Sequence, residues 1–399
     1  MRRIILFLCL GLLFPACLSA QKKVMAQART YLKSGKDFDK AEKLMNDLLA
    51  DSANRGNMKI RLIQFEAVKK QYEQGNEKLY LKQKYDTAAL FTHTYKMFHM
   101  LEAIDSLDML PDKKGEVKPK YRAKHAEFLN IYRPNLYNGG GYYIQKQDFS
   151  RAYQFYKTYL DCATQPLFEG YDYQNSDSIM PKAAYGALYC GYKLKKPELV
   201  FAHEELALQD TVHIDFVYQY VAETYLSQKD TANYVATLLK GFEHSPEFPY
   251  FFPRLTDYYN RRGEMDEAMK IIDKALSIDS LNSIYRFAKS TVLLNTGKFN
   301  ECIAICKELI AENDSLADAY YNLGLAYFTQ AIELDKKSQH SRAVHRKIRE
   351  LYEKSRPYME RYRTLAPQRQ RKWRPVLYTI YLNLNMGEEF DEINKLRMR

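Results

Sequence analysis

The sequence predicts an all-α protein, a solenoid in which antiparallel helix pairs stack side by side without a β-sheet. One observation is a pattern of large apolar residues that recurs every 34 residues through the second half of the chain. Another is that these residues are spaced three and four apart, as on one face of a helix. The third is the scarcity of Gly (16) and Pro (13) among 399 residues, which disfavours many short strands and tight turns.

Residues 1–20 are predicted to form a signal peptide. Arg2 and Arg3 precede an apolar run from Ile4 to Phe14, which is too short to span a bilayer and is followed by small residues. Cleavage is expected at the end of this segment. The layout predicts export, with the mature protein either periplasmic or peripheral to the outer membrane.

Cys17 leaves a second outcome open. The order Phe14-Pro15-Ala16-Cys17 loosely resembles a bacterial lipobox, in which the cysteine is lipidated and becomes the new N-terminus. The usual leucine stands one place too early, at Leu13. Lipid anchoring at Cys17 is therefore the alternative to simple cleavage.

The repeat is clearest in four windows that open at Asp215, Pro249, Ser283 and Ala317. The fourth, seventh, eighth and eleventh places of a window form one stripe of its first helix. This stripe is read in three of the windows as Tyr218, Val221, Ala222 and Tyr225, as Phe252, Leu255, Thr256 and Tyr259, and as Tyr320, Leu323, Gly324 and Tyr327. The third window departs from the pattern, because Arg286 and Lys289 lie on its stripe.

A second helix follows in each window. Gly263 and Gly297 mark the turns before it, and Ala268 and Cys302 lie on its apolar face. Cys306 lies one turn after Cys302, where the two Cβ atoms of a helix are about 5–6 Å apart, so both are expected to be buried thiols rather than a disulfide. A single pair of short helices cannot bury both of its faces, so the stacking of pairs makes the core.

Residues 317–328 (ADAYYNLGLAYF) resemble the first helix of the tetratricopeptide-repeat (TPR) family. The small residues at the eighth place of a window (Gly324 and Ala222) and at the twentieth (Ala268) would let paired helices approach closely. The resemblance implies a right-handed superhelical solenoid of antiparallel helix pairs. It also implies a non-catalytic scaffold that binds a protein or peptide partner.

The resemblance weakens upstream of the four windows. TPR-like spacing persists in windows from Lys22 and Arg133, with longer helices between them. The predicted regions are a divergent helical region over residues 21–180 and a regular array over residues 181–399, with a basic insertion near residues 336–351.

Two polar stretches interrupt the helical pattern. One runs from Asp105 to Pro119 and the other from Gln165 to Pro181. Loops of this length are commonly binding segments or linkers. The second stretch marks the predicted boundary between the divergent and the regular region.

Motifs that would indicate catalysis or a cofactor are incomplete. His203 to Ala207 begins like a zinc-protease helix, but Ala207 stands where the second histidine is required. Asn138 to Gly141 is glycine-rich, yet no Gly-Lys-Ser/Thr follows, so close helix packing at Gly140 is the simpler interpretation. No Cys/His set has zinc spacing. We therefore expect no enzyme activity, no cofactor and no metal, and a small-molecule substrate is not expected.

The TPR resemblance also implies where a partner would bind. In that family the second, fifth, ninth, twelfth and thirteenth places of each first helix line an inner groove. The candidate groove residues carried over to this chain are Gln219, Glu223, Tyr250, Asp257, Asn260, Phe287, Thr291, Asp318, Tyr321, Leu325 and Phe328. This mixture of aromatic and polar groups suits an extended peptide. It lacks the Lys and Asn of chaperone-binding TPRs, whose places hold Pro253 and Asp257.

The alternative function is glycan binding, as in outer-membrane-associated helpers of the SusD-like type that contain TPRs. Those proteins are usually longer and carry a clear lipobox. Tryptophan, the favoured residue for stacking on sugars, occurs once here, at Trp373. The protein- or peptide-binding scaffold in the envelope of a Gram-negative cell is the leading hypothesis.

Basic residues concentrate in one segment. Residues 336–374 hold 14 Lys and Arg against three acids, whereas the whole chain has a net charge of +11. If the segment is helical, one face carries Arg342, Arg346, Arg349, Arg356 and Arg363, and Pro357 should bend or interrupt the helix. This face is either a solvated surface or a docking surface for anionic envelope lipid or an acidic protein. Nucleic acid is not expected as a partner after export.

Overall fold

The computed structural model describes residues 20–337 and 341–396. Within these ranges every regular element is helical and no strand occurs, which confirms the predicted all-α fold. Residues 1–19, with Cys17 and nearly all of the predicted signal peptide, lie outside the described residues, so export and lipidation stay predictions. None of the described helices combines the length and the apolar character needed to cross a bilayer.

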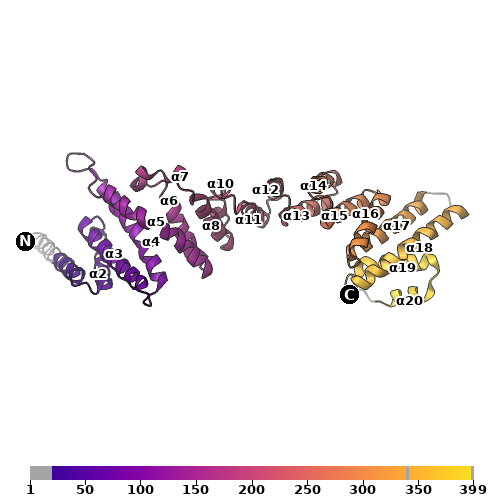
Figure 1. Cartoon of the computed structure of the whole chain (residues 1–399), viewed down its shortest axis with the longest axis horizontal. Coiled ribbons are helices and arrows are strands. Elements are labelled where there is room, and N and C mark those ends of the chain that lie inside the picture. The colour runs from indigo at the N-terminus through magenta and orange to yellow at the C-terminus, as the bar shows by residue number, and fades with distance from the viewer. Residues whose placement is uncertain (1–19, 338–340, 397–399) are drawn as a thin grey trace, which may run out of the picture. The chain divides into compact units, whose positions relative to one another are not determined.

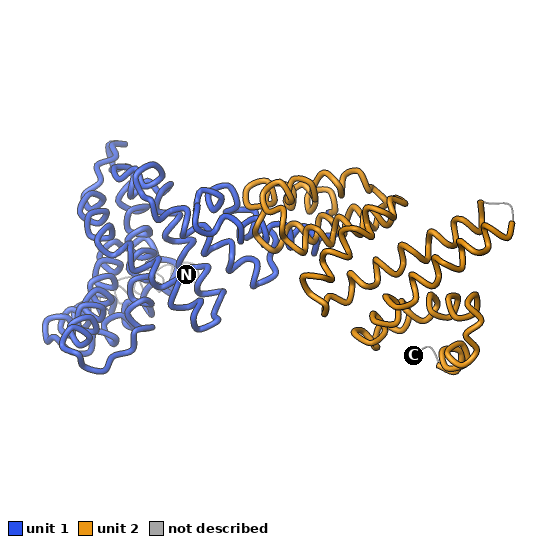
Figure 2. Tube along the Cα trace, turned by 45° about the vertical axis from the view of Figure 1, so that its right-hand side comes forward, with its two compact units in different colours: residues 1–230 blue, residues 231–399 orange. Residues whose placement is uncertain are grey.

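The chain divides into two compact units, one ending at Asp230 and the other beginning at Thr231 (Figure 2). The boundary predicted near residue 180 falls inside the first unit. There α8 (Met180–Lys193) packs on α6 (Phe149–Asp161), and both helices contribute to one apolar core. The change near residue 180 is thus a change in sequence regularity and not a break in packing.

In the first unit, the long helices pack on their neighbours in sequence, with α6 on α8 (Figure 1). Three of its helices are 22 to 24 residues long, in keeping with the longer helices expected upstream. After a helix over residues 20–34, the elements are α2 (Phe38–Ala50), η1 (Ser52–Asn54), α3 (Met58–Tyr80), α4 (Thr87–Asp108), α5 (Arg122–Gln145), α6, η2 (Pro166–Tyr171), α7 (Tyr173–Ser176), α8, α9 (Pro197–Phe201), α10 (Glu204–Ala207) and α11 (Ile214–Ser227).

The second unit continues the same arrangement with helices of more regular length, followed by one long pair. Its elements are α12 (Thr231–His244), α13 (Phe251–Arg262), α14 (Met265–Ile278), α15 (Ser283–Asn295), α16 (Phe299–Glu312), α17 (Ala317–Lys337), α18 (Arg342–Leu365), α19 (Gln370–Leu384) and α20 (Gly387–Lys395). The predicted helix pairs in the windows from Pro249 and Ser283 are α13–α14 and α15–α16.

The same turn joins the two helices of successive pairs. Its central residues Gly263 and Gly297 are 34 residues apart, which is the period of the sequence repeat. Its central residue has a left-handed backbone, with φ of 74° at Gly263 and 76° at Gly297. The next N–H then reaches back to a carbonyl five residues earlier, as from Glu264 to Tyr259 at 3.0 Å. The same turn occurs at residues that are not glycine, namely Gln147, Lys195, Lys229 and Asn385.

Replacing Gln147 by glycine is expected to raise the free energy of unfolding by about 0.5–1 kcal/mol. The φ of 59° at Gln147 is strained for a residue with a Cβ, and this gain exceeds the extra chain entropy of glycine. Urea unfolding followed by circular dichroism measures the change. The reverse exchange, Gly263→Gln, serves as the matched control and should destabilise by a similar amount; an unchanged or lower stability of the Gln147 variant contradicts the argument.

Glycines allow neighbouring helices to approach closely, as the sequence predicted for Gly140 and Gly324. A Cβ placed on Gly140 would lie 2.5 Å from the ring of Tyr156, and one on Gly186 would lie 2.6 Å from the same ring. Tyr156 is therefore held between α5 and α8 only because both positions lack a side chain. Gly324 is equally close to Met359 of α18, at 2.7 Å, and its carbonyl accepts a hydrogen bond from Ser355 Oγ at 2.7 Å.

The irregular third window keeps its helices because its charges are paired. Arg286 is 9% exposed, and its guanidinium binds Glu308 and Glu312 of α16 at 2.8 and 2.6 Å. Lys289 binds Asp273 of α14 at 2.9 Å. The aliphatic stem of each cation covers the stripe while its charged end reaches a carboxylate on a neighbouring helix.

Cys302 and Cys306 are buried free thiols, as predicted. Their sulfur atoms are 4.0 Å apart, about twice the 2.05 Å of a disulfide. Both side chains fill the apolar core between α16 and α17.

The basic insertion lengthens the two helices of the fourth window, and α17 and α18 span 21 and 24 residues. The sequence predicted that Pro357 would bend or interrupt this helix. An interruption does not occur, because α18 is continuous through Pro357. The helix continues because Ile348, Tyr352 and Met359 are buried on both sides of the proline. Packing against neighbouring helices offsets the single backbone hydrogen bond that proline removes.

Candidate functional site

In the first unit, aromatic side chains of α8 and α11 form a continuous row of rings. Tyr185, Tyr189 and Tyr192 are four and three residues apart, so they share one face of α8. On α11, Phe216 and Tyr220 share the face that meets them. Tyr220 connects the two helices, with its ring 5.5 Å from Tyr189 and stacked 4.5 Å from Tyr192. We call these five residues the aromatic strip.

A pocket of about 510 Å³ opens at the end of the aromatic strip. Tyr192, Pro197 and Val200 supply apolar surface, while Thr224 and Ser227 of α11 supply hydroxyl groups. The remaining lining residues are charged, namely Lys193, Lys195, Lys196 and Glu223.

Of the predicted groove residues, Glu223 lines this pocket, and Gln219, one turn earlier on α11, contacts Glu223. The amide of Gln219 donates a hydrogen bond to one oxygen of Glu223 at 3.1 Å, and the hydroxyl of Tyr192 donates to the other. The bond to this carboxylate, together with burial, raises the pKa of Tyr192 to about 12. Tyr192 therefore stays protonated at neutral pH and holds the Glu223 carboxylate in place.

The predicted groove residues in α13 and at Tyr250, which precedes it, are less available to a partner. Tyr250 is only 5% exposed, and the guanidinium of Arg254 covers its ring at 3.6 Å, which corrects the expectation that Tyr250 lines an open groove. Asp257 is exposed and bound to Arg261 one turn later at 3.0 Å, and Asn260 is half-buried.

On α15 and α17 the predicted residues are half-buried contacts between helices. Thr291 accepts a hydrogen bond from Asn322 at 3.0 Å, and Phe287 on the preceding turn is half-buried. On α17, Asp318 binds Arg369, while Tyr321, Leu325 and Phe328 pack on the core formed with α18 and α19. The ring of Tyr321 lies 4.9 Å from that of Tyr362 and has Lys372 over it.

The predicted basic face of α18 does not form one surface. Arg342, Arg346 and Arg349 are exposed, but Arg346 and Arg349 bind Glu350 and Glu353 one turn later. The other two arginines are half-buried: Arg356 contacts Met386, and Arg363 binds Glu392 and lies over Trp373. The expected face of five exposed arginines is therefore wrong for its last two members, because α19 and α20 cover the C-terminal half of α18.

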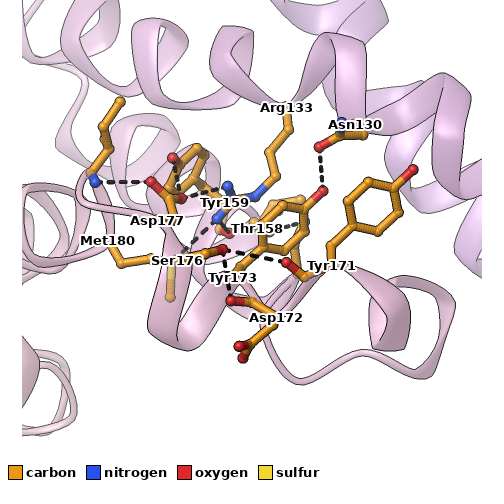
Figure 3. Close-up of polar contacts among 12 residues, drawn as sticks. Asn130, Arg133, Thr158, Tyr159, Tyr171, Asp172, Tyr173, Ser176, Asp177 and Met180 are labelled. Atoms are coloured by element: carbon orange, nitrogen blue, oxygen red, sulfur yellow. Dashed lines mark hydrogen bonds and ion pairs between the residues drawn. The ribbon is translucent and has the colours of Figure 1, made fainter.

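A buried arginine was not recognised as important in the sequence. Arg133 of α5 is 5% exposed, and its guanidinium lies between the rings of Tyr159 and Tyr173, at 3.7 and 3.8 Å (Figure 3). Its Nη1 binds Asp177 at 2.5 Å, and Asp177 also accepts a hydrogen bond from the hydroxyl of Tyr159 at 2.6 Å. We call Arg133, Tyr159, Tyr173 and Asp177 the arginine clasp.

The arginine clasp explains why the polar stretch after Gln165 is ordered. The stretch forms η2 and α7, and it buries Leu167, Phe168 and Tyr173. Burial alone would raise the pKa of Asp177, but hydrogen bonds from Tyr159 and Arg133 outweigh it and lower that pKa. The available signal was an arginine on an apolar stripe, four residues after Leu129 and three before Leu136.

Comparisons of the sequence with protein families and with curated proteins find no match. Among the described residues, no group of three His, Cys, Asp or Glu could hold a metal ion.

Solved structures with similar folds have low sequence identity to this chain. One is the C-terminal part of a TPR repeat-containing protein from Cytophaga hutchinsonii, at 9% identity, covering 64% of this chain and 92% of that chain with a TM-score of 0.42. Another is the human IFIT1 dimer with m7Gppp-AAAA, at 13% identity, 86% and 72% coverage and a TM-score of 0.38. YrrB, a TPR protein with an unusual peptide-binding site, is 15% identical, with 62% and 93% coverage and a TM-score of 0.26.

The paired helices, the 34-residue spacing and the recurring turn together define the class of the protein. It has a TPR-like, all-α helical-repeat fold. Stacked helical repeats of this kind form extended concave surfaces, which repeat proteins use for binding.

Proposed function

We propose that the chain is a non-catalytic scaffold that binds a protein or peptide partner in the cell envelope. The observation that carries the proposal is the aromatic strip, five rings from two neighbouring first helices that end at a pocket. Half-buried tyrosines give a partner a rigid apolar surface and a polar tip at low cost in conformational entropy. The location in the envelope rests on the predicted signal peptide.

The alternative of glycan binding has less support. The chain's one tryptophan, Trp373, is 3% exposed and belongs to the apolar core shared by α18, α19 and α20, so it is not available to stack on a sugar. The tyrosines of the aromatic strip are able to stack on either kind of ligand, so a glycan array provides the contrasting experiment.

A peptide array probed with the chain lacking residues 1–20 tests the proposal. We expect it to capture a subset of peptides, and we expect Tyr189→Ala to weaken their binding about tenfold or more, since central aromatic residues dominate such interfaces. Tyr80→Ala is the matched control, because Tyr80 is 85% exposed on α3, away from the strip. Capture of glycans but of no peptide, or equal binding by the Tyr189 variant, would overturn the proposal.

A further inference from the structure

Three lysines surround the pocket at the end of the aromatic strip. Lys193 lies in the last turn of α8, and Lys195 and Lys196 form the turn that leads into α9. All three are exposed. Within residues 20–337 and 341–396 none of the three lysines has an ion-pair partner. We call them the lysine rim.

Glu223 is the only acidic residue among those that line the pocket, and both of its carboxylate oxygens accept hydrogen bonds. The donors are Tyr192 and Gln219, and within the described residues Glu223 forms no ion pair with the lysine rim. The pocket therefore carries three positive charges against one fixed negative charge. A ligand with two or more carboxylates complements this balance.

The partial negative charge at the C-terminal end of α8 does not cancel the attraction between the lysine rim and an anionic ligand. A helix C-terminus carries a partial negative charge, which acts against an anion by about 0.3–1 kcal/mol. Here the carbonyls of Gly191 and Tyr192 are already bonded, at 3.0 Å each, by the N–H groups of Lys196 and Lys195. Those bonds hold the lysine rim at the mouth of the pocket, where three full charges outweigh a partial one.

The inner wall of the pocket is apolar. Val200 is 1% exposed, and Pro197 and the ring of Tyr192 lie beside it. An apolar side chain placed there would leave water while neighbouring carboxylates stay at the exposed rim. This combination favours a peptide over a simple anion, because a peptide carries both kinds of group within a few residues.

We propose that the lysine-rimmed pocket binds an extended acidic segment of a partner protein, with an apolar side chain in the pocket and flanking carboxylates on Lys193, Lys195 and Lys196. This inference rests on the proposed function and adds the chemistry of the partner. It assigns docking to the turn between α8 and α9 and not to the basic face of α18.

Fluorescence anisotropy with two labelled peptides tests the inference. The first peptide has the sequence Gly-Glu-Leu-Glu-Glu-Gly, and the second replaces each Glu by Gln. The full mature chain should bind the acidic peptide at least about tenfold more tightly than its neutral counterpart, and the difference should shrink as salt rises. Equal binding of the two peptides overturns the inference and leaves the proposed function standing if the array has captured other peptides.

Charge variants locate the site. The triple variant Lys193→Glu, Lys195→Glu, Lys196→Glu should weaken binding of the acidic peptide at least about tenfold. The matched control is Lys113→Glu, Lys114→Glu, Lys120→Glu, which makes the same change of charge at exposed positions of the same unit. Equal weakening by both variants means that the net charge and not the pocket is responsible, and it overturns the inference.

An uncharged variant separates the pocket from its rim. Ser227→Trp places a large ring in the pocket without changing the charge, and it should also weaken binding about tenfold. Unchanged binding by this variant would overturn the role of the pocket. Anionic phospholipid vesicles provide the last comparison: capture of the chain by vesicles, lost in the lysine-rim variant, would show a membrane and not a peptide as the partner.

Discussion

Replacing Arg133 by methionine is expected to lower the free energy of unfolding of the first unit by about 3–5 kcal/mol. The change leaves Asp177, whose side chain is 13% exposed, without its cation, and it removes the guanidinium that lies between two tyrosine rings. Losing one member of a buried ion pair costs more than the pair itself contributes, because the remaining charge has no partner. Urea unfolding followed by circular dichroism measures the loss.

The double variant Arg133→Met, Asp177→Asn is the control. It should recover a large part of the stability, since no buried charge is left. The pH dependence gives a second check. With its lowered pKa, Asp177 stabilises the folded wild type above its unfolded pKa of about 3.9, and this contribution is lost as the pH falls through the folded pKa. The gap between wild type and Arg133→Met should therefore narrow in acid; a gap that stays constant or is below 1 kcal/mol at neutral pH contradicts the arginine clasp.

Replacing Gly191 by alanine is expected to cost about 1–3 kcal/mol by overpacking. A Cβ at this position would lie 2.8 Å from Cβ of Leu199 and 3.0 Å from the backbone nitrogen of Val200. Backbone atoms of α9 cannot turn away as the end of a flexible side chain can, so the two helices must separate. The expected result is a lower midpoint of urea unfolding.

Gly387→Ala is the matched control for this prediction. Gly387 begins α20, and a Cβ there would meet nothing within 4 Å. The change should be neutral or slightly stabilising, because alanine favours a helix over glycine by up to about 1 kcal/mol. If Gly191→Ala were as mild as Gly387→Ala, the close approach of α8 and α9 would not be required.

Most of the fold was predictable because its signals are local. The spacing of Leu255 and Tyr259, or of Leu323 and Tyr327, places apolar groups on one helix face whatever lies beyond that helix. The turn at Gly263 and Gly297 is also set by neighbouring residues. The same turn at Gln147 or Lys195 was harder to see, because these positions adopt a left-handed backbone without the glycine that would signal it.

The candidate site was only partly predictable, for the opposite reason. Arg133 and Asp177 are 44 residues apart in sequence, and nothing local pairs them. The burial of Tyr250 depends on Arg254 lying across its ring, and the division of the basic face depends on α19 and α20 covering α18. Glu223 and Gln219 were identified from their repeat position, but the lysine rim beside them comes from the preceding window, which the sequence pattern left out.

The division of the chain into two units, each with its own apolar clusters, affects how it responds to heat. Contacts in a helical array join near neighbours, so the melting of one part is only loosely coupled to that of another. Calorimetry should then show overlapping heat-absorption peaks and a van't Hoff enthalpy smaller than the calorimetric one. A single melting temperature would describe only the weaker unit, and a ligand bound to the first unit would shift one peak and leave the other in place.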